Sequence, residues 1–142
     1  MNFRIRIATA GDVPAMHRVR TSVRENRLSD PQQVTEASYL PYIRAGTVWL
    51  AEGDIGILGF AAIDTPAMSV WALFIHPDAE GGGVGRALHL HMLASAQERG
   101  LTRLSLCTQE GTRAECFYKR AGWTEAGKTD DGELLFEKRL LS

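Results

Sequence analysis

Four glycines lie within residues 81–85, and this cluster constrains the fold of the chain more than any other feature. It follows an apolar run over 68–75 that is typical of a buried strand. Apolar residues then recur at helical spacing from 84 until Gly100 ends the helix, and a second strand pattern spans 103–108. A strand, a helix and a strand in this order predict a crossover connection between two parallel strands of one sheet.

The glycine cluster lies between the predicted strand and the first turn of the predicted helix. Its backbone N–H groups are unobstructed beside the positive end of a helix dipole, which favours binding of a pyrophosphate. The alternative is that the glycines only permit a tight turn, although four glycines are more than a turn needs. The dinucleotide-binding fingerprint does not fit, because its third glycine would fall at Arg86 or Leu88.

A second phosphate-binding pattern occurs at 122–129, where a glycine and four residues precede Gly-Lys-Thr. We reject this match on its context, because a Walker loop joins a buried strand to a helix. Here the segment follows a predicted helix and leads into a strand. Only thirteen residues remain after Thr129, too few for the rest of an NTPase sheet.

The remaining pattern predicts one α/β (α+β) domain over residues 1–142, with a mixed sheet of about seven strands flanked by helices. A hairpin turn is expected at Gly53-Asp54. The predicted order is strand 3–7, helix 12–23, helix 31–45, strands 47–52, 57–64 and 68–75, helix 84–99, strand 103–108, helix 112–121, and strands 123–128 and 133–140.

The charge balance excludes a global positive field for nucleic acid, because sixteen Lys and Arg face seventeen Asp and Glu and the net charge is −1. Arginines between positions 4 and 27 form the best local patch, but they are spread over a strand and a helix, so we expect no nucleic-acid partner. The longest apolar run, 68–75, is far shorter than the roughly 20 residues of a membrane span. We therefore expect no membrane partner.

Two cysteines, Cys107 and Cys116, are too few for a small disulfide scaffold and favour a reduced, cytoplasmic protein. We interpret both as small buried hydrophobic residues rather than as acyl relays. His89 and His91 are two positions apart on a predicted helix, so they face different ways and cannot share a metal. The sequence predicts no metal site.

The acetyl-CoA loop of the GCN5-related N-acetyltransferase (GNAT) superfamily resembles residues 76–88, which read His-Pro-Asp-Ala-Glu-Gly-Gly-Gly-Val-Gly-Arg-Ala-Leu. That family's second signature is similar to residues 114–123, which read Ala-Glu-Cys-Phe-Tyr-Lys-Arg-Ala-Gly-Trp. The order of predicted elements agrees over nearly the whole chain. The resemblance implies transfer of an acetyl group from acetyl-CoA directly to a primary amine of a small-molecule or peptide acceptor. Dimers are common in the family, so a homodimer is also an expectation.

The resemblance implies that the pantetheine arm lies along the end of strand 68–75 and the pyrophosphate at the glycine loop. The cofactor-binding residues implied are Leu73, Phe74, Ile75, Gly81, Gly82, Gly83, Val84, Gly85, Arg86 and Phe117. Two residues depart from the family pattern. Glu80 replaces the usual Gln or Arg and should repel a pyrophosphate unless it points to solvent. Gly111 replaces a frequent Asn, which removes one side-chain contact to the pantetheine arm.

Tyr118 is the implied general acid, which gives a proton to the departing CoA thiolate. The ordinary pKa values of a thiol and a phenol, about 8.5 and 10, make this transfer only mildly uphill. The alternative is that Tyr118 merely packs beside Phe117 on an amphipathic helix. Glu25, near the end of the first predicted helix, is the first candidate for the general base and Asp64 the second. Glu25 fits a solvated charge at a helix end equally well.

A second function remains open on the same residues. A catalytically silent acyl-CoA-binding module is suggested by Glu80 and by the lack of a carboxylate between Ser69 and Ile75. Trp71, in that strand, is either a core residue or a wall of the acceptor pocket. His76 is interpreted as a capping or packing residue.

Overall fold

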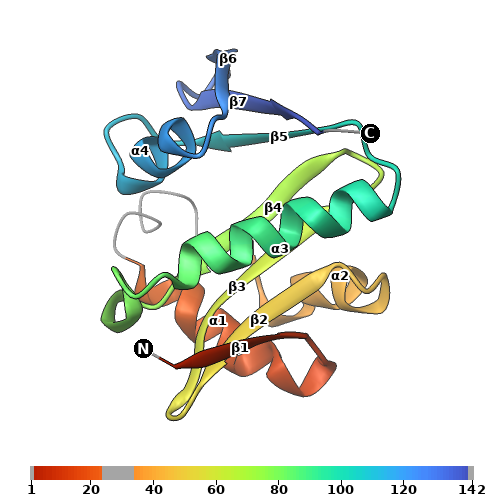
Figure 1. Ribbon diagram of the computed structural model, residues 1–142, viewed down its shortest axis with the longest axis vertical. Helices are drawn as coiled ribbons and strands as arrows, with labels where there is room; N and C mark the ends of the chain where they lie inside the picture. Colours follow the sequence, from red (N-terminus) through yellow and green to blue (C-terminus); the bar gives the residue numbers. More distant parts are fainter. Residues whose placement is uncertain (1, 24–33, 141–142) are drawn as a thin grey trace.

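A seven-stranded mixed sheet organises the chain, with the strand order β1-β2-β3-β4-β5-β7-β6 (Figure 1). The computed structural model describes residues 2–23 and 34–140. The strands are β1 (Phe3–Ile7), β2 (Val48–Gly53), β3 (Gly56–Asp64), β4 (Ser69–Ile75), β5 (Arg103–Thr108), β6 (Thr124–Lys128) and β7 (Leu134–Arg139). The helices are α1 (Val13–Ser22), α2 (Leu40–Arg44), α3 (Val84–Glu98) and α4 (Arg113–Arg120), with short 3₁₀ turns at Ala10–Asp12, Glu36–Tyr39 and Pro77–Ala79.

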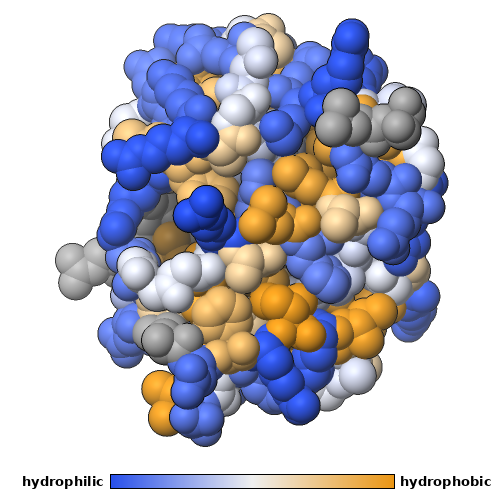
Figure 2. All heavy atoms as spheres, viewed as in Figure 1, coloured by the Kyte–Doolittle hydropathy of each residue, from blue (hydrophilic) through white to orange (hydrophobic). Residues whose placement is uncertain are grey.

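Helices cover both faces of the sheet. α3 crosses one face and buries the apolar residues whose helical spacing predicted it, which are Val84, Leu88, Met92 and Ala96. α1 and α2 pack on the opposite face. β3 is buried on both faces, which explains its nearly unbroken apolar sequence. Figure 2 shows the α3 face, where hydrophobic residues gather near the middle and hydrophilic residues dominate the periphery.

β4 and β5 are parallel, as the crossover pattern predicted, but within the described residues they pair only at Ser69 and Ser105. On its other edge β5 pairs with β7 over its whole length. The sheet therefore has two parts, β1–β4 and β5-β7-β6, joined where β4 and β5 begin. Figure 1 shows the two strands close together at their starts and apart at their ends, on the side where α4 lies and α3 begins.

A β-bulge interrupts β4 at Trp71. Ala62 pairs with Ala72 and Ile63 with Val70, so Trp71 is an extra residue on the β4 side of the pair. The bulge places Trp71 and Ala72 together on the α1 and α2 face.

The turn between β2 and β3 differs from the expectation. It consists of Asp54 and Ile55, because Gly53 is the last residue of β2 and pairs with Gly56. A Cβ on Gly53 would lie 2.8 Å from Cδ1 of Leu58. Glycine is needed at position 53 for close packing inside the strand pair rather than for the turn.

The expectation that the cysteines are buried was wrong, because Cys107 and Cys116 are exposed free thiols. The period of a strand explains Cys107: Leu104 and Leu106 of β5 point into the core, so Cys107 points away from it.

The predicted helix over 31–45 is represented by the 3₁₀ turn Glu36–Tyr39 and by α2, and its expected start near Pro31 lies outside the described residues. Across residues 2–23 and 34–140, no helix is long and apolar enough to cross a membrane.

Candidate active site

The separation of β4 from β5 leaves one edge of β4 without a neighbouring strand. Beyond Ser69, residues 70–75 have no strand partner on the β5 side within the described part of the chain, whereas β3 pairs with their other edge. Backbone N–H and C=O groups need partners, so an extended ligand can pair with this edge as an added strand does. We call the region between residues 70–75 and residues 106–109 the β4–β5 opening.

The side chains of β4 that the sequence implicated in cofactor binding divide between the two faces of the sheet. Leu73 and Ile75 pack against the buried residues between α3 and the sheet, which we call the α3 cluster, and Phe74 packs on the α1 and α2 face. Phe117 of α4 packs against the α3 cluster as well. These predicted residues therefore lie on both faces of the sheet, three on the α3 face and one on the α1 and α2 face.

The glycine loop follows β4 and leads into α3. Gly81 and Gly83 have positive φ angles of 80° and 85°, and Gly83 is the N-cap of α3. A Cβ built on either glycine would meet no atom within 4 Å. The need for a tight turn therefore explains why glycine occupies these two positions. The open space beside them also supports the prediction that the loop binds a pyrophosphate.

The other residues of the loop have different tasks. The backbone N–H of Gly82 donates to the carbonyl of Ala79 at 3.3 Å. Val84 is buried and anchors the first turn of α3, and Arg86 is exposed. A Cβ on Gly85 would lie 3.4 Å from Cγ1 of Ile75 and 3.7 Å from Cε1 of Phe117. These are ordinary van der Waals distances, so Gly85 lies against β4 and α4 without glycine being required there.

Two charged residues meet at the start of the glycine loop. Glu80 does not simply point to solvent, because its Oε2 forms an ion pair with Nη1 of Arg113, the first residue of α4. The repulsion expected between Glu80 and a pyrophosphate is therefore offset by a cation from the other side of the β4–β5 opening. Nearby, His76 caps the 3₁₀ turn, because its Nδ1 accepts a hydrogen bond from the N–H of Asp78 at 3.0 Å.

Gln109 is a candidate site residue that the sequence analysis missed. It follows β5 directly, and its Oε1 is buried without a hydrogen-bond partner among the described residues. A buried amide oxygen without a partner is costly, so Oε1 is an acceptor available to a water molecule or to a ligand N–H. The available signal was a polar side chain directly after the strand that faces β4.

The N-terminus of α4 explains why glycine occupies position 111. Gly111 has a φ of 81°, a conformation that glycine adopts freely and that Asn tolerates better than most residues. Its N–H donates to Oε1 of Glu115 at 2.7 Å, and Thr112 caps the helix by accepting from the N–H of Glu115. The hydrogen bonds from Gly111 and Lys119 lower the pKa of Glu115. This capped start fixes α4, which carries Phe117 and Tyr118.

Tyr118 is buried at the centre of an aromatic cluster. Its ring makes edge contacts with Phe117 and Trp123 at centroid distances of 5.3 and 5.4 Å, and it packs against Phe136 at 6.3 Å. Burial raises the pKa of its phenol well above the ordinary value. The ring packs as the alternative interpretation expects, and the catalytic role of the hydroxyl stays a prediction.

His89 joins this cluster from α3. Its Nε2 accepts a 2.9 Å hydrogen bond from Nε1 of Trp123, and its ring contacts Phe117 edge-on. Burial, with a smaller effect of Lys138, lowers the pKa of His89 to about 4. His91 instead contacts Trp49, which agrees with the two histidines facing different ways. No group of three metal-ligating side chains occurs in the part of the chain that the structure describes.

The opposite face of β4 carries a second aromatic group with one cation. Trp71 stacks on Tyr42 at a centroid distance of 4.4 Å. The guanidinium of Arg20, from α1, lies 5.1 Å from the ring centre of Trp71 and 4.7 Å from that of Phe74. Burial lowers the pKa of Arg20, and the nearby Tyr39 hydroxyl opposes this. Trp71, Phe74 and Arg20 thus form one packed group on this face of β4.

The structure describes only one of the two candidates for the general base. Glu25 lies outside the described residues. Asp64 ends β3, and its Oδ1 accepts a hydrogen bond from the N–H of Ala67 at 3.2 Å. Burial, with a smaller effect of Asp64, raises the pKa of Tyr42. Asp64 is thus a carboxylate beside the aromatic group that contains Trp71.

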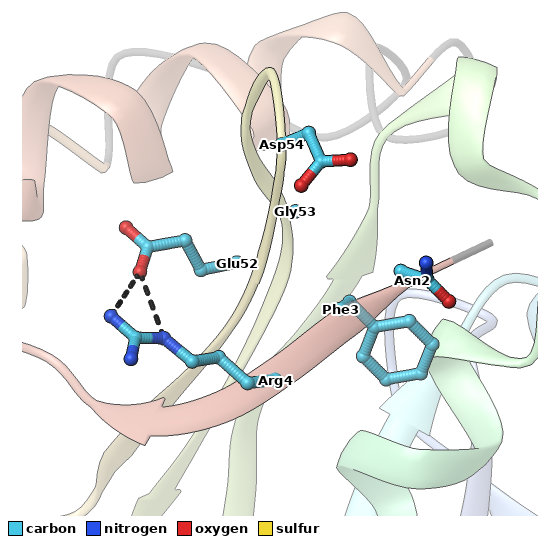
Figure 3. Close-up of a pocket in the computed structure, with 6 residues that line it drawn as sticks. All are labelled: Asn2, Phe3, Arg4, Glu52, Gly53 and Asp54. Carbon is cyan, nitrogen blue, oxygen red and sulfur yellow. Dashed lines mark hydrogen bonds and ion pairs between the residues drawn. The ribbon is translucent and has the colours of Figure 1, made fainter.

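A hollow of about 310 Å³ lies far from the β4–β5 opening, at the outer edge of the sheet (Figure 3). Its lining residues are Asn2, Phe3, Arg4, Glu52, Gly53 and Asp54. Arg4 pairs with Glu52 at 3.0 Å, and Arg6 pairs with Asp12 at 2.9 Å. These arginines of β1 are therefore neutralised, and we see no group in the hollow that is suited to catalysis.

A family model described as an acetyltransferase (GNAT) domain matches residues 44–125, which are more than half of the chain. The matched segment contains β4, the glycine loop, β5 and α4.

Individual relatives and structures agree with this match. The 5-NmdU N-acetyltransferase of Pseudomonas phage PaMx11 is 31% identical over 105 residues, 71% of this chain and 71% of that protein. The peptidyl-lysine N-acetyltransferase YjaB of Escherichia coli is 35% identical over 99 residues, 68% of this chain and 60% of YjaB. The PaiA N-acetyltransferase of Thermoplasma acidophilum, solved in complex with coenzyme A, has the same fold, with a TM-score of 0.81 at 16% identity over 98% of this chain and 99% of that chain.

Proposed function

The chain belongs to the GNAT family of N-acetyltransferases, and from this premise we propose that it transfers the acetyl group of acetyl-CoA directly to a primary amine of a small-molecule or peptide acceptor. The observation that supports this most is the open edge of β4 leading directly into the glycine loop. When bound, acetyl-CoA supplies the activated thioester.

The residues around the β4–β5 opening fit the three chemical parts of acetyl-CoA. The loop from Gly81 to Arg86 offers open space at an α-helix N-terminus, which suits a diphosphate. The free edge of residues 70–75 suits the amides of a pantetheine arm, with Leu73, Phe74, Ile75 and Phe117 around it. The buried Oε1 of Gln109 suits an amide N–H of the same arm.

Tyr118 is the proposed general acid, and its Oη gives a proton to the departing sulfur. Burial raises the pKa of the phenol, so Tyr118 keeps its proton throughout the physiological pH range, as a donor must. A thiolate in the same desolvated place also becomes a stronger base. How readily the proton moves depends on the difference between the pKa of the Tyr118 phenol and the pKa of the CoA thiol, rather than on either value alone.

The acceptor is proposed to approach from the α1 and α2 face, beside Trp71 and Phe74. The guanidinium of Arg20 lies beside both rings and helps to hold them in place for an acceptor. Asp64 and Glu25 remain the proposed bases for the proton that the amine loses.

Calorimetric titration with acetyl-CoA tests the cofactor, using the wild type, Gly83→Asp and a matched control. Gly132 is the control because it has nearly the same φ, 83° against 85°, and its Cβ would also meet nothing within 4 Å. Both Asp variants carry the same backbone strain and added charge. We expect the wild type and Gly132→Asp to bind and Gly83→Asp to lose binding. Absence of binding by a folded wild type would contradict the proposal.

Turnover is tested by thiol release with a panel of amines, including the peptide lysine and 5-NmdU that the names of the relatives specify. Acetylation of one of these amines is the expected result. Tight binding of acetyl-CoA without turnover on any amine would instead support the catalytically silent acyl-CoA-binding module.

A further inference from the structure

The ion pair between Glu80 and Arg113 connects two segments that are otherwise separate. Glu80 directly precedes Gly81, and Arg113 begins α4, 33 positions later. β4 and β5, which lead into these segments, pair only at Ser69 and Ser105 within the described residues. The Glu80–Arg113 pair therefore reaches across the wide end of the β4–β5 opening, where the diphosphate is proposed to bind.

The exposure of the two side chains decides what this pair can contribute. The side chain of Arg113 is 71% exposed and that of Glu80 is 37% exposed. Exposed pairs contribute little to folding stability, about 0 to 1 kcal/mol. A stabilising role does not explain why the pair is placed here. Its effect on charge is larger, because a carboxylate next to the cradle would oppose an anionic ligand.

We propose that Arg113 is a positioning residue for acetyl-CoA binding, which acts by compensating the charge of Glu80 beside the glycine loop. This inference rests on the proposed function. The charge that these two side chains contribute together beside the loop is then what matters for binding. It is zero in the wild type, +1 in Glu80→Gln, −1 in Arg113→Gln and zero again in the double variant, from one carboxylate and one guanidinium.

The test is a double-variant cycle in which the Kd for acetyl-CoA is measured by calorimetry at low ionic strength. Coulomb interactions between charges several ångströms apart near water predict about three- to tenfold weaker binding in Arg113→Gln and tighter binding of similar size in Glu80→Gln. The double variant should return to within about twofold of the wild type, because the loss of one negative and one positive charge leaves the net charge unchanged. Arg113→Lys keeps the charge and should bind as the wild type does.

Two controls separate this role from a structural one. Arg103→Gln removes the same charge from the start of β5, where Arg103 faces Glu137 at 3.9 Å, and should leave the Kd unchanged. Raising the salt concentration to about 1 M, where the screening length is about 3 Å, should bring the four Kd values of the cycle together. Thermal unfolding of the unliganded variants should differ little, because the pair is exposed.

Each outcome bears on the inference. If the wild type binds acetyl-CoA and Arg113→Gln binds equally well, Arg113 has no positioning role and the inference is wrong. If the double variant binds as weakly as Arg113→Gln, Arg113 does not act through Glu80, which also overturns it. If the folded wild type does not bind acetyl-CoA, the proposed function itself is contradicted. This outcome differs from the two above, in which the wild type binds.

Discussion

The indole Nε1 of Trp123 donates a 2.9 Å hydrogen bond to Nε2 of His89, and this bond joins the segment before β6 to the middle of α3. Both side chains are buried, and the His89 ring also contacts Phe117 of α4 edge-on. Nε2 can accept this bond only when it carries no proton, so His89 must be neutral. The contact of Trp123 with α3 is therefore coupled to the protonation state of one histidine.

This coupling predicts a loss of stability in mild acid. The pKa of His89 falls from 6.5 to about 4 on folding. Below pH 6.5 the unfolded chain binds the proton more readily than the folded one, so stability is full above this pH and falls until about pH 4. We expect a loss on the order of 1–2 kcal/mol after allowance for solvent screening. Urea unfolding between pH 7 and pH 4 measures it.

His89→Gln and His17→Gln are the matched variants for this experiment. His89→Gln should flatten the dependence of unfolding free energy on pH, and His17→Gln should preserve it, although His17 also has a side-chain partner, Tyr39 at 2.9 Å. The lowered pKa of Asp12, about 2 instead of 3.8, affects stability mainly below about pH 4. Equal slopes in wild type and His89→Gln would exclude the coupling.

Tyr118→Phe should lower kcat at saturating acceptor while leaving the Kd for acetyl-CoA nearly unchanged. The ring contacts with Phe117 and Trp123 survive the substitution, so the fold is retained and only the proton donor is lost. A positioned general acid contributes roughly 10² to 10⁴ in rate. A kcat for Tyr118→Phe within about twofold of the wild type would leave Tyr118 a packing residue only.

Gln109→Leu should change stability and affinity in opposite directions. The variant removes a buried oxygen that has no partner in the described structure, which should stabilise the unliganded protein by about 1 kcal/mol. It also removes the proposed acceptor for a pantetheine amide, so the Kd for acetyl-CoA should rise about fivefold. Gln97→Leu, at an exposed position of α3, is the control. Unchanged affinity in Gln109→Leu would remove this residue from the site.

Trp71→Ala should impair binding of the acceptor without affecting acetyl-CoA. Its indole stacks on Tyr42 and lies beside the guanidinium of Arg20, both on the α1 and α2 face. Loss of this aromatic surface should raise the KM of the acceptor about tenfold. Trp71→Phe keeps a ring and should behave nearly as the wild type. A rise in the Kd for acetyl-CoA, with an unchanged acceptor KM, would place Trp71 on the cofactor side instead.

Local patterns were sufficient wherever neighbouring residues specify the backbone. The spacing of Val84, Leu88, Met92 and Ala96 predicted the buried face of α3, and all four are buried. The strand, glycine and helix order predicted that β4 and β5 are parallel. Local patterns failed for Cys107, because hydrophobic character alone does not show which face of β5 points into the core.

The sequence by itself determined the order of the elements, the glycine turn and the family, because these depend on residues close together in the chain. Only the tertiary structure decided that Arg113 pairs with Glu80, that Trp123 donates to His89 and that Gln109 holds a buried oxygen without a described partner. The two pairs join residues 33 and 34 positions apart. They form because α3 and α4 pack together where β4 and β5 separate, and no local pattern specifies which side chains meet there.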